Sequence, residues 1–161
     1  MDTREFRRAL GAFATGVSAV CAENTQGEPF GITVNSFTSV SLEPPLILVC
    51  LAKHADTLPP ILETKHFSVN VLALDQTAIS QALAQKGGTQ KMASVPLCRT
   101  PSGTPGIAGA MARFDCRLFA TYPGGDHEIL VGEVLSFETE AEKEPLVYWR
   151  GAYRKLAQGD G

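Results

Sequence analysis

Small polar side chains cluster between residues 33 and 41, where they could bind a ligand rich in hydrogen-bond acceptors. Six of these nine residues carry a hydroxyl or an amide: Thr33, Asn35, Ser36, Thr38, Ser39 and Ser41. Such groups are small and neutral, and they leave backbone N–H groups accessible to a ligand. A surface loop is the alternative interpretation of this composition. The order along the chain favours a binding site, because a β-branched stretch precedes the cluster and a buried, purely apolar strand at 46–51 follows it.

A second candidate is His127, which follows Gly124-Gly125-Asp126 and opens a predicted strand. The sequence Gly-Gly-Asp is typical of a tight turn, so these three residues need no further role. A histidine at the mouth of a barrel strand can nevertheless stack on a planar ligand or hydrogen-bond to it. The spacing supports the structural and the ligand-binding interpretations equally.

Several other chemistries are not expected. No GxSxG, HExxH, Walker A or GxGxxG motif occurs in the chain. The three histidines, His54, His66 and His127, do not stand at metal-ligand spacing, so no metal site is predicted. Four widely spaced cysteines form neither a disulfide scaffold nor a CxxC zinc site.

Length and composition are typical of a soluble globular protein. The chain of 161 residues is expected to form one domain, with 44% hydrophobic and 19% charged residues. A net charge of −3 without blocks of like charge argues against nucleic-acid binding. No apolar run approaches the roughly 20 residues that span a membrane. The N-terminus lacks the apolar core of a signal peptide, so a cytoplasmic protein is expected.

The elements that would position these residues are mainly β-strands. Strands are predicted at 17–22, 30–34, 46–51, 66–72, 110–121 and 127–139, with 122–126 joining the last two. Short helices are predicted at the N-terminus and at 55–63 and 76–85. This pattern indicates an antiparallel barrel with peripheral helices. The stretch 87–109, rich in Gly, Ser, Thr and Pro, is predicted to be a long loop.

Two helix starts have a predicted cap. Asp2 is expected to cap the first helix, which presents Phe6, Leu10 and Phe13 on one apolar face and stops at Thr15-Gly16. Asp75 is expected to cap the helix at 76–85.

Taken together, the motifs resemble the short-chain flavin reductases, the NAD(P)H:flavin oxidoreductases that serve two-component flavin monooxygenases. The similarity extends from residue 5 to residue 156. Its most specific parts are the T-x-N-S-x-x-S-V-S element at 33–41 and the Gly125-Asp126-His127 turn. The other matching segments are Phe13-Ala-Thr-Gly-Val17, Glu43-Pro-Pro-Leu46, Phe67-Ser-Val-Asn-Val-Leu72 and Tyr148 with Gly151-Ala-Tyr153. The resemblance implies a split β-barrel that binds FMN or FAD, usually as a homodimer.

The resemblance also implies roles for individual residues. The flavin ring and ribityl chain would lie along Thr33, Val34, Asn35 and Ser36, while Ser39, Val40 and Ser41 would approach the chain and phosphate. The segment Cys50, Leu51, Ala52 and Lys53 would wrap the other side. Lys53 would offer a point charge, with a solvated loop lysine as the alternative, and Thr57 would offer an anion-binding helix N-terminus. His127 would contact the nicotinamide nucleotide, and Tyr153 would lie near the flavin or pack in the core.

The chain departs from the family at Lys91-Met92, where an Arg/Lys-Phe pair is common. The expected reaction is hydride transfer from NADH or NADPH to FMN or FAD, which needs little acid–base machinery. The expected partner is a flavin-dependent monooxygenase that receives reduced flavin. Two alternatives stay open: a flavin-containing reductase of a metal or corrinoid acceptor, and a non-catalytic flavin- or haem-binding split barrel.

Overall fold

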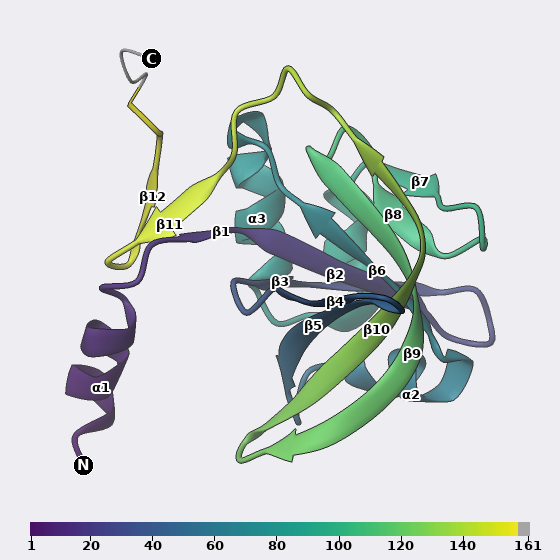
Figure 1. The fold of residues 1–161 in the computed structure, drawn as a ribbon, viewed down its shortest axis with the longest axis horizontal. Helices are drawn as coiled ribbons and strands as arrows, with labels where there is room; N and C mark the ends of the chain where they lie inside the picture. The colour runs from purple at the N-terminus through teal and green to yellow at the C-terminus, as the bar shows by residue number, and fades with distance from the viewer. Residues whose placement is uncertain (158–161) are drawn as a thin grey trace.

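Seven antiparallel strands form the main sheet, which curls into a split β-barrel in the computed structural model (Figure 1). The structure describes residues 1–157. The order of the strands in this sheet is β3-β2-β6-β9-β10-β5-β4. Their bounds are Ser18–Glu23 (β2), Pro29–Val34 (β3), Thr38–Leu42 (β4), Pro45–Ala52 (β5), His66–Val71 (β6), Ala112–Gly124 (β9) and His127–Thr139 (β10).

Helices and two smaller sheets surround this barrel. One small sheet has the order β1-β11-β12, and the other pairs β7 with β8. The bounds of these elements are Thr3–Leu10 (α1), Thr15–Gly16 (β1), Leu58–Thr64 (α2), Leu74–Gln76 (η1), Thr77–Leu83 (α3), Gly88–Ser94 (η2), Leu97–Arg99 (β7), Pro105–Ile107 (β8), Val147–Trp149 (β11) and Ala152–Arg154 (β12). No helix among residues 1–157 is long and apolar enough to cross a membrane.

Strand β2 separates two hydrophobic clusters and is therefore buried on both faces. Val20 and Ala22 belong to the barrel core, while Ala19 and Cys21 belong to the cluster under α3 and η2. Burial is the main cause that raises the pKa of the Cys21 thiol to about 12. Burial likewise raises the pKa of the Cys116 thiol, in the barrel core, to about 12. Both thiols are therefore neutral packing groups.

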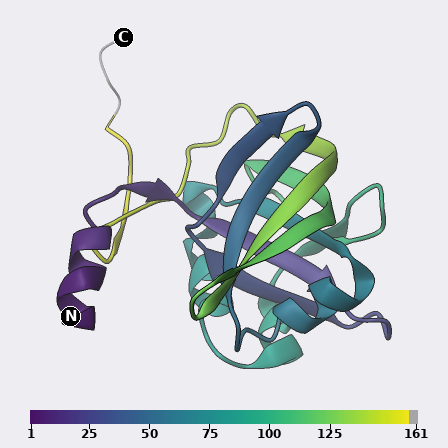
Figure 2. The ribbon, with the colours of Figure 1, turned by 60° about the horizontal axis from the view of Figure 1, so that its bottom comes forward.

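The small sheet and the N-terminal helix form a unit beside the barrel, which we call the terminal arm (residues 1–16 and 147–154). The arm stands apart from the barrel in both views (Figures 1 and 2). Asp2 caps α1 as predicted, because its Oδ1 accepts hydrogen bonds from the N–H groups of Arg4 at 2.7 Å and Glu5 at 3.3 Å. The arm is held together where Trp149 Nε1 donates to the carbonyl of Ala12 at 3.1 Å.

The structure corrects four of the local predictions. The first helix ends at Leu10 with Gly11 as its C-cap, and Thr15–Gly16 is strand β1 rather than a helix stop. Its apolar face is not buried by any other part of residues 1–157, since α1 has no buried residue. Asp75 is not a helix cap, because a 3-10 turn precedes α3 and the Asp75 carboxylate lies 3.8 Å from Lys143 Nζ. The stretch 87–109 contains η2, β7 and β8 and is not a long loop.

Candidate functional site

The two predicted ligand-binding segments, 33–41 and 50–53, lie side by side. The hydroxyl of Ser36 accepts a hydrogen bond from the N–H of Cys50 at 2.9 Å and donates to its carbonyl at 3.1 Å. Thr33 is anchored in another direction, because its hydroxyl donates to the carbonyl of Ser80 at 2.7 Å. Val34 packs against the barrel core. These side chains fix the backbone, and Asn35 between them stays exposed.

The second half of the polar cluster is strand β4, which pairs with β5. Its register is shifted between Ser39 and Ser41, and Val40 is left 47% exposed at this irregularity. The hydroxyl of Ser41 accepts a hydrogen bond from the N–H of Glu43 at 3.2 Å. Beneath it, β5 alternates between buried residues such as Val49 and partly buried residues such as Leu48, so this strand is less buried than its apolar sequence predicts.

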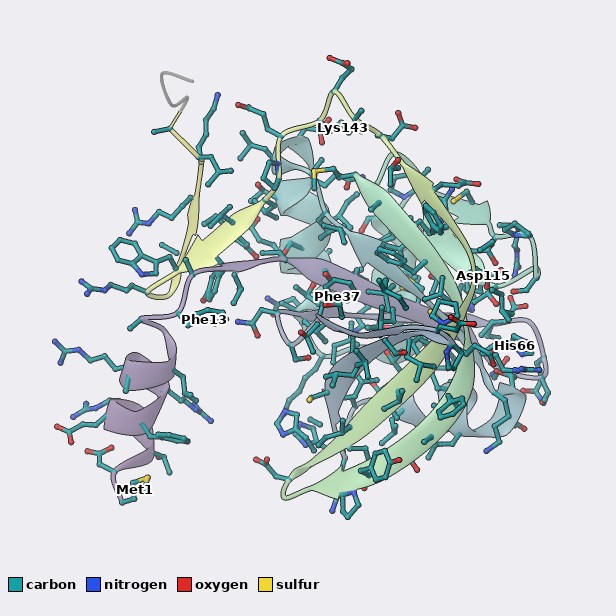
Figure 3. The ribbon with its side chains drawn as sticks, in the orientation of Figure 1. Met1, Phe13, Phe37, His66, Asp115 and Lys143 are labelled. Atoms are coloured by element: carbon teal, nitrogen blue, oxygen red, sulfur yellow. The ribbon has the colours of Figure 1, made fainter. Side chains whose placement is uncertain are left out.

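A cavity of about 590 Å³ opens between the arm and the polar segment. On the barrel side it is lined by Asn35, Ser36, Phe37 and Thr38, and on the arm side by Arg7, Leu10, Gly11, Phe13, Thr15 and Tyr148. Figure 3 shows Phe13 at the arm and Phe37 at the barrel, on the two sides of this cavity. Arg7, Phe37 and Tyr148 were not predicted to line the cavity. The usable signals were the adjacency of Phe37 to Ser36 and the place of Tyr148 in a segment that matches the family.

His127 begins β10 and is held against the segment 50–53. Its backbone pairs with Ala52 on one side and with Gly124 on the other. Its Nδ1 lies 2.7 Å from Asp126 Oδ1, and this hydrogen bond is the main cause that lowers the pKa of Asp126. The N–H of Lys53 donates to the carbonyl of Asp126 at 3.0 Å. The imidazole is thus fixed beside the predicted flavin segment with Nε2 as its free nitrogen.

Lys53 and Thr57 offer less to an anion than the sequence suggests. Lys53 Nζ lies 3.7 Å from Glu128 Oε1, so its charge has a partner. Thr57 is only 1% exposed. The first turn of α2 has no free N–H, because Leu58 N donates to Ala55 at 3.0 Å and Pro59 and Pro60 carry no N–H. The helix N-terminus expected at Thr57 is therefore closed to an anion.

Tyr153, Lys91 and Met92 all contact other parts of the protein through hydrogen bonds or packing. The hydroxyl of Tyr153 lies 2.7 Å from Ser80 Oγ, and its ring packs edge-on against Tyr148 at 5.5 Å. Met92 is buried below Gly31, where an added Cβ would come within 2.8 Å of the methionine sulfur. Lys91 Nζ donates to the carbonyls of Leu83 and Gln85 at the end of α3. These three side chains support the elements around the cavity and do not line it.

Comparison with known proteins identifies the family of this chain. Residues 10–157 match the family described as Flavin reductase like domain. The chain belongs to this family. An FMN reductase (NADH), SmoA of Agrobacterium fabrum, is 41% identical over 157 residues, covering 98% of this chain and 88% of SmoA.

A second relative is the reductase component of a flavin-dependent trigonelline monooxygenase from Acinetobacter baylyi. It is 39% identical over 150 residues, which are 93% of this chain but only 48% of that longer protein. Among solved structures, the NADH:FAD oxidoreductase SgcE6 of Streptomyces globisporus, in complex with NAD and FAD fragments, has a TM-score of 0.93 and 35% identity. The match covers 99% of this chain and 96% of SgcE6.

These matches confirm the family, the mainly β split barrel and the enzyme class, NAD(P)H:flavin oxidoreductase, that the sequence predicts. The substrates are NADH and a flavin, FMN or FAD.

Proposed function

We propose that this flavin reductase binds FMN or FAD as an exchangeable substrate and passes the reduced flavin to a separate monooxygenase. The observation that carries the proposal is the pair of hydrogen bonds between Ser36 and Cys50, together with the pairing of His127 and Ala52. These contacts join Ser36 to Cys50 and Ala52 to His127, so three of the predicted binding segments are neighbours, whereas Thr57 and Tyr153 lie outside the cavity lining. The open cavity beside them is suited to a ligand that enters and leaves.

The protein contributes position rather than reactive groups. The flavin supplies the chemistry, since it accepts a hydride from nicotinamide C4 at its N5 atom. The fixed backbone around Asn35 and Ser36 presents small neutral donors to the polar edge of the ring. Phe37 and Tyr148 would supply apolar walls for the ring. His127, with Nε2 free, lies where the nicotinamide nucleotide would stack on the exposed ring face.

We also propose that the working form is a homodimer whose second copy covers the arm. Phe6, Leu10 and Phe13 are 51%, 58% and 78% exposed. A helix of eight residues such as α1 is marginal in water unless another surface packs against it. The half-buried outer side of β5 offers a further apolar surface. Because NADH is the expected co-substrate, we place this enzyme in the cytoplasm.

The test of the flavin site is a substitution that fills the cavity without touching the hydrogen bonds that hold it. Asn35→Leu puts a branched apolar group where the ring edge would lie. We expect it to weaken FMN binding, measured by quenching of flavin fluorescence, by about tenfold or more, which corresponds to loss of one or two hydrogen bonds. NADH oxidation with added FMN or FAD should fall in parallel.

The matched control is Gln81→Leu, which makes a similar polar-to-apolar change on the exposed side of α3. It should leave FMN affinity unchanged. Unaltered FMN affinity in a folded Asn35→Leu variant would refute the placement of the flavin beside residues 35–38.

A further inference from the structure

Among the described residues that line the cavity beside Asn35 and Ser36, Arg7 alone carries a charge. Arg7, Leu10 and Gly11 stand at positions i, i+3 and i+4, so they turn one side of α1 and its C-cap toward the cavity. Within residues 1–157, Arg7 forms no ion pair. Its guanidinium charge is therefore available to a ligand in this cavity.

The backbone fixes the end of α1 that carries Arg7. The N–H of Gly11 donates to the carbonyl of Arg7 at 2.9 Å, and the N–H of Arg150 donates to the carbonyl of Gly11 at 3.0 Å. A few residues further on, Thr15 pairs with Tyr148 between β1 and β11. The last turn of α1 is thus tied to the small sheet, whose Tyr148 lines the same cavity as Arg7.

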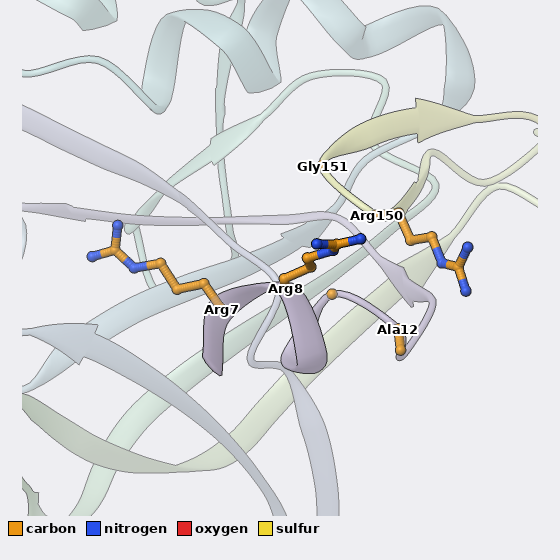
Figure 4. Close-up of a pocket in the computed structure, with 6 residues that line it drawn as sticks. Arg7, Arg8, Ala12, Arg150 and Gly151 are labelled. Carbon is orange, nitrogen blue, oxygen red and sulfur yellow. The ribbon is translucent and has the colours of Figure 1, made fainter. Parts of the chain in front are cut away.

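Arg8, the next residue along α1, is directed elsewhere. In Figure 4 its side chain extends toward Arg150, whereas Arg7 extends from the helix in the other direction. Arg8 lines an adjoining cavity of about 500 Å³ and is absent from the lining of the cavity at Asn35. Both arginines lie in the last turn of α1, where a cation interacts favourably with the helix dipole. Helix stabilisation therefore explains both residues equally, but it does not explain why Arg7 lines the flavin cavity.

The reaction of the proposed function places a negative charge on the ring that would occupy this cavity. The hydride takes two electrons from nicotinamide C4 to flavin N5, so NADH becomes NAD⁺ and the flavin gains one negative charge. No proton accompanies the hydride, and the charge is shared by N1 and the C2 carbonyl oxygen of the ring. A cation placed where charge develops stabilises both the transition state and the product. The lining residues on the barrel side, Asn35, Ser36, Phe37 and Thr38, supply no such charge.

We propose that Arg7 stabilises the reduced flavin as an anion, so that the site binds reduced flavin more tightly than oxidised flavin. The guanidinium would donate hydrogen bonds to the N1–C2 edge of the ring, across the cavity from Asn35. Charge-assisted hydrogen bonds of this kind are stronger than those between neutral groups. The inference rests on the proposed function, and it adds that the terminal arm sets the redox preference of the flavin site.

The test compares the wild type with Arg7→Gln in anaerobic titrations of oxidised FMN and of dithionite-reduced FMN, followed by quenching of protein fluorescence. The flavin phosphate is the same in both forms, so its contribution cancels in the ratio of the two dissociation constants. We expect the preference for reduced FMN to fall by about three- to tenfold in the variant. For two electrons this corresponds to a decrease of about 15–30 mV in the midpoint potential of the bound flavin. The absorption spectrum of the bound reduced flavin should also show that N1 loses its proton at a higher pH, because the cation that favours the anion is gone.

Arg8→Gln is the matched control, because it removes the same charge one residue along α1, outside the cavity at Asn35. It should keep the redox preference of the wild type, and Arg7→Lys, which retains a cation, should keep part of it. Equal affinity of the wild type for the two forms of FMN would overturn this inference alone. An unchanged preference in the folded Arg7→Gln variant, or an equal decrease in Arg8→Gln, would do the same. A wild type that binds neither form would overturn the proposed function as well.

Discussion

The hydroxyl side chains of the candidate site act mainly on the protein's own backbone. Thr33 hydrogen-bonds to the backbone of α3, Ser36 to the backbone of β5, and Ser41 to the backbone of the turn at Glu43. Their effect on a ligand is therefore indirect, because they determine where the backbone N–H groups and the neighbouring Asn35 lie. The sequence correctly identified a rigid polar segment, but residue type alone does not distinguish a hydroxyl that contacts a ligand from one that holds the chain.

At the same scale, loss of the His127 side chain should impair the reaction with NADH and leave flavin binding largely intact. His127→Ala removes a side chain that is 44% exposed and already oriented by Asp126. We expect kcat/KM for NADH to fall by about tenfold to a hundredfold, which corresponds to about 1–3 kcal/mol for one good contact. FMN affinity should change little. Steady-state NADH oxidation and fluorescence quenching provide the two measurements.

His66→Ala is the matched control for that prediction. His66 begins β6, and its Nδ1 lies 3.0 Å from the carbonyl of Thr64, away from the cavity. The His66→Ala variant should leave kcat/KM for NADH unchanged. If His127→Ala lowers the melting temperature but turns over NADH normally, the histidine has only a structural role in the turn.

At the scale of elements, the sequence predicted the strands that carry long alternating or β-branched patterns. Strand β10 runs from His127 to Thr139, as predicted, because its alternation is sustained and a Gly-Gly-Asp turn marks its start. Strand β9 was also predicted, although it starts two residues later than expected, at Ala112, and continues to Gly124. Tertiary pairing with β10 extends it into residues that the sequence marks as a turn.

The elements that were missed depend on contacts distant in sequence. Strands β7 and β8 have three residues each, too few to show a period. They exist because Asn70 Oδ1 accepts from the N–H of Ile107 at 2.9 Å and Ser68 donates to Pro105 at 2.6 Å. The exposure of α1 was also unpredictable from one chain, since an apolar face indicates packing but not the identity of the packing partner.

The long hairpin of β9 and β10 depends on a glycine inside the sheet. Gly132 faces the barrel core, and an added Cβ would lie 2.6 Å from Phe67 Cζ and 3.1 Å from Cys116 Cβ. Both neighbours are fully buried and cannot move aside easily. Gly132→Ala should therefore lower the free energy of unfolding by about 1–3 kcal/mol, measured by urea denaturation.

Gly16→Ala tests whether that loss is caused by the close contact. Gly16 is exposed, and a Cβ there would meet no atom within 4 Å. The free energy of unfolding should change by no more than about 0.5 kcal/mol. Equal losses in the two variants would mean that the close contact in the core around Gly132 is not the cause.

At the scale of the whole molecule, charge and apolar surface are concentrated together in the arm. The protein is acidic overall, with a net charge of −3, yet Arg4, Arg7, Arg8, Arg150 and Arg154 all belong to the arm. The same unit exposes Phe6, Leu10 and Phe13. In the proposed dimer, apolar contact would hold a second copy at the arm, and the arm also lines the cavity beside Asn35 and Ser36. The arm would thereby link assembly to flavin binding.

This link predicts that breaking the dimer also weakens flavin binding. The variant Phe6→Glu places a charge on the exposed apolar face of α1, outside the cavity, where a buried carboxylate would be costly at an interface. We expect sedimentation to show a dimer for the wild type and a monomer for the variant at the same micromolar concentration. The monomeric variant should also bind FMN more weakly than the wild type. Arg4→Glu, a charge change on the same helix, is the control and should stay dimeric. A wild type that sediments as a monomer and still binds FMN would show that the arm serves the flavin site within a single chain.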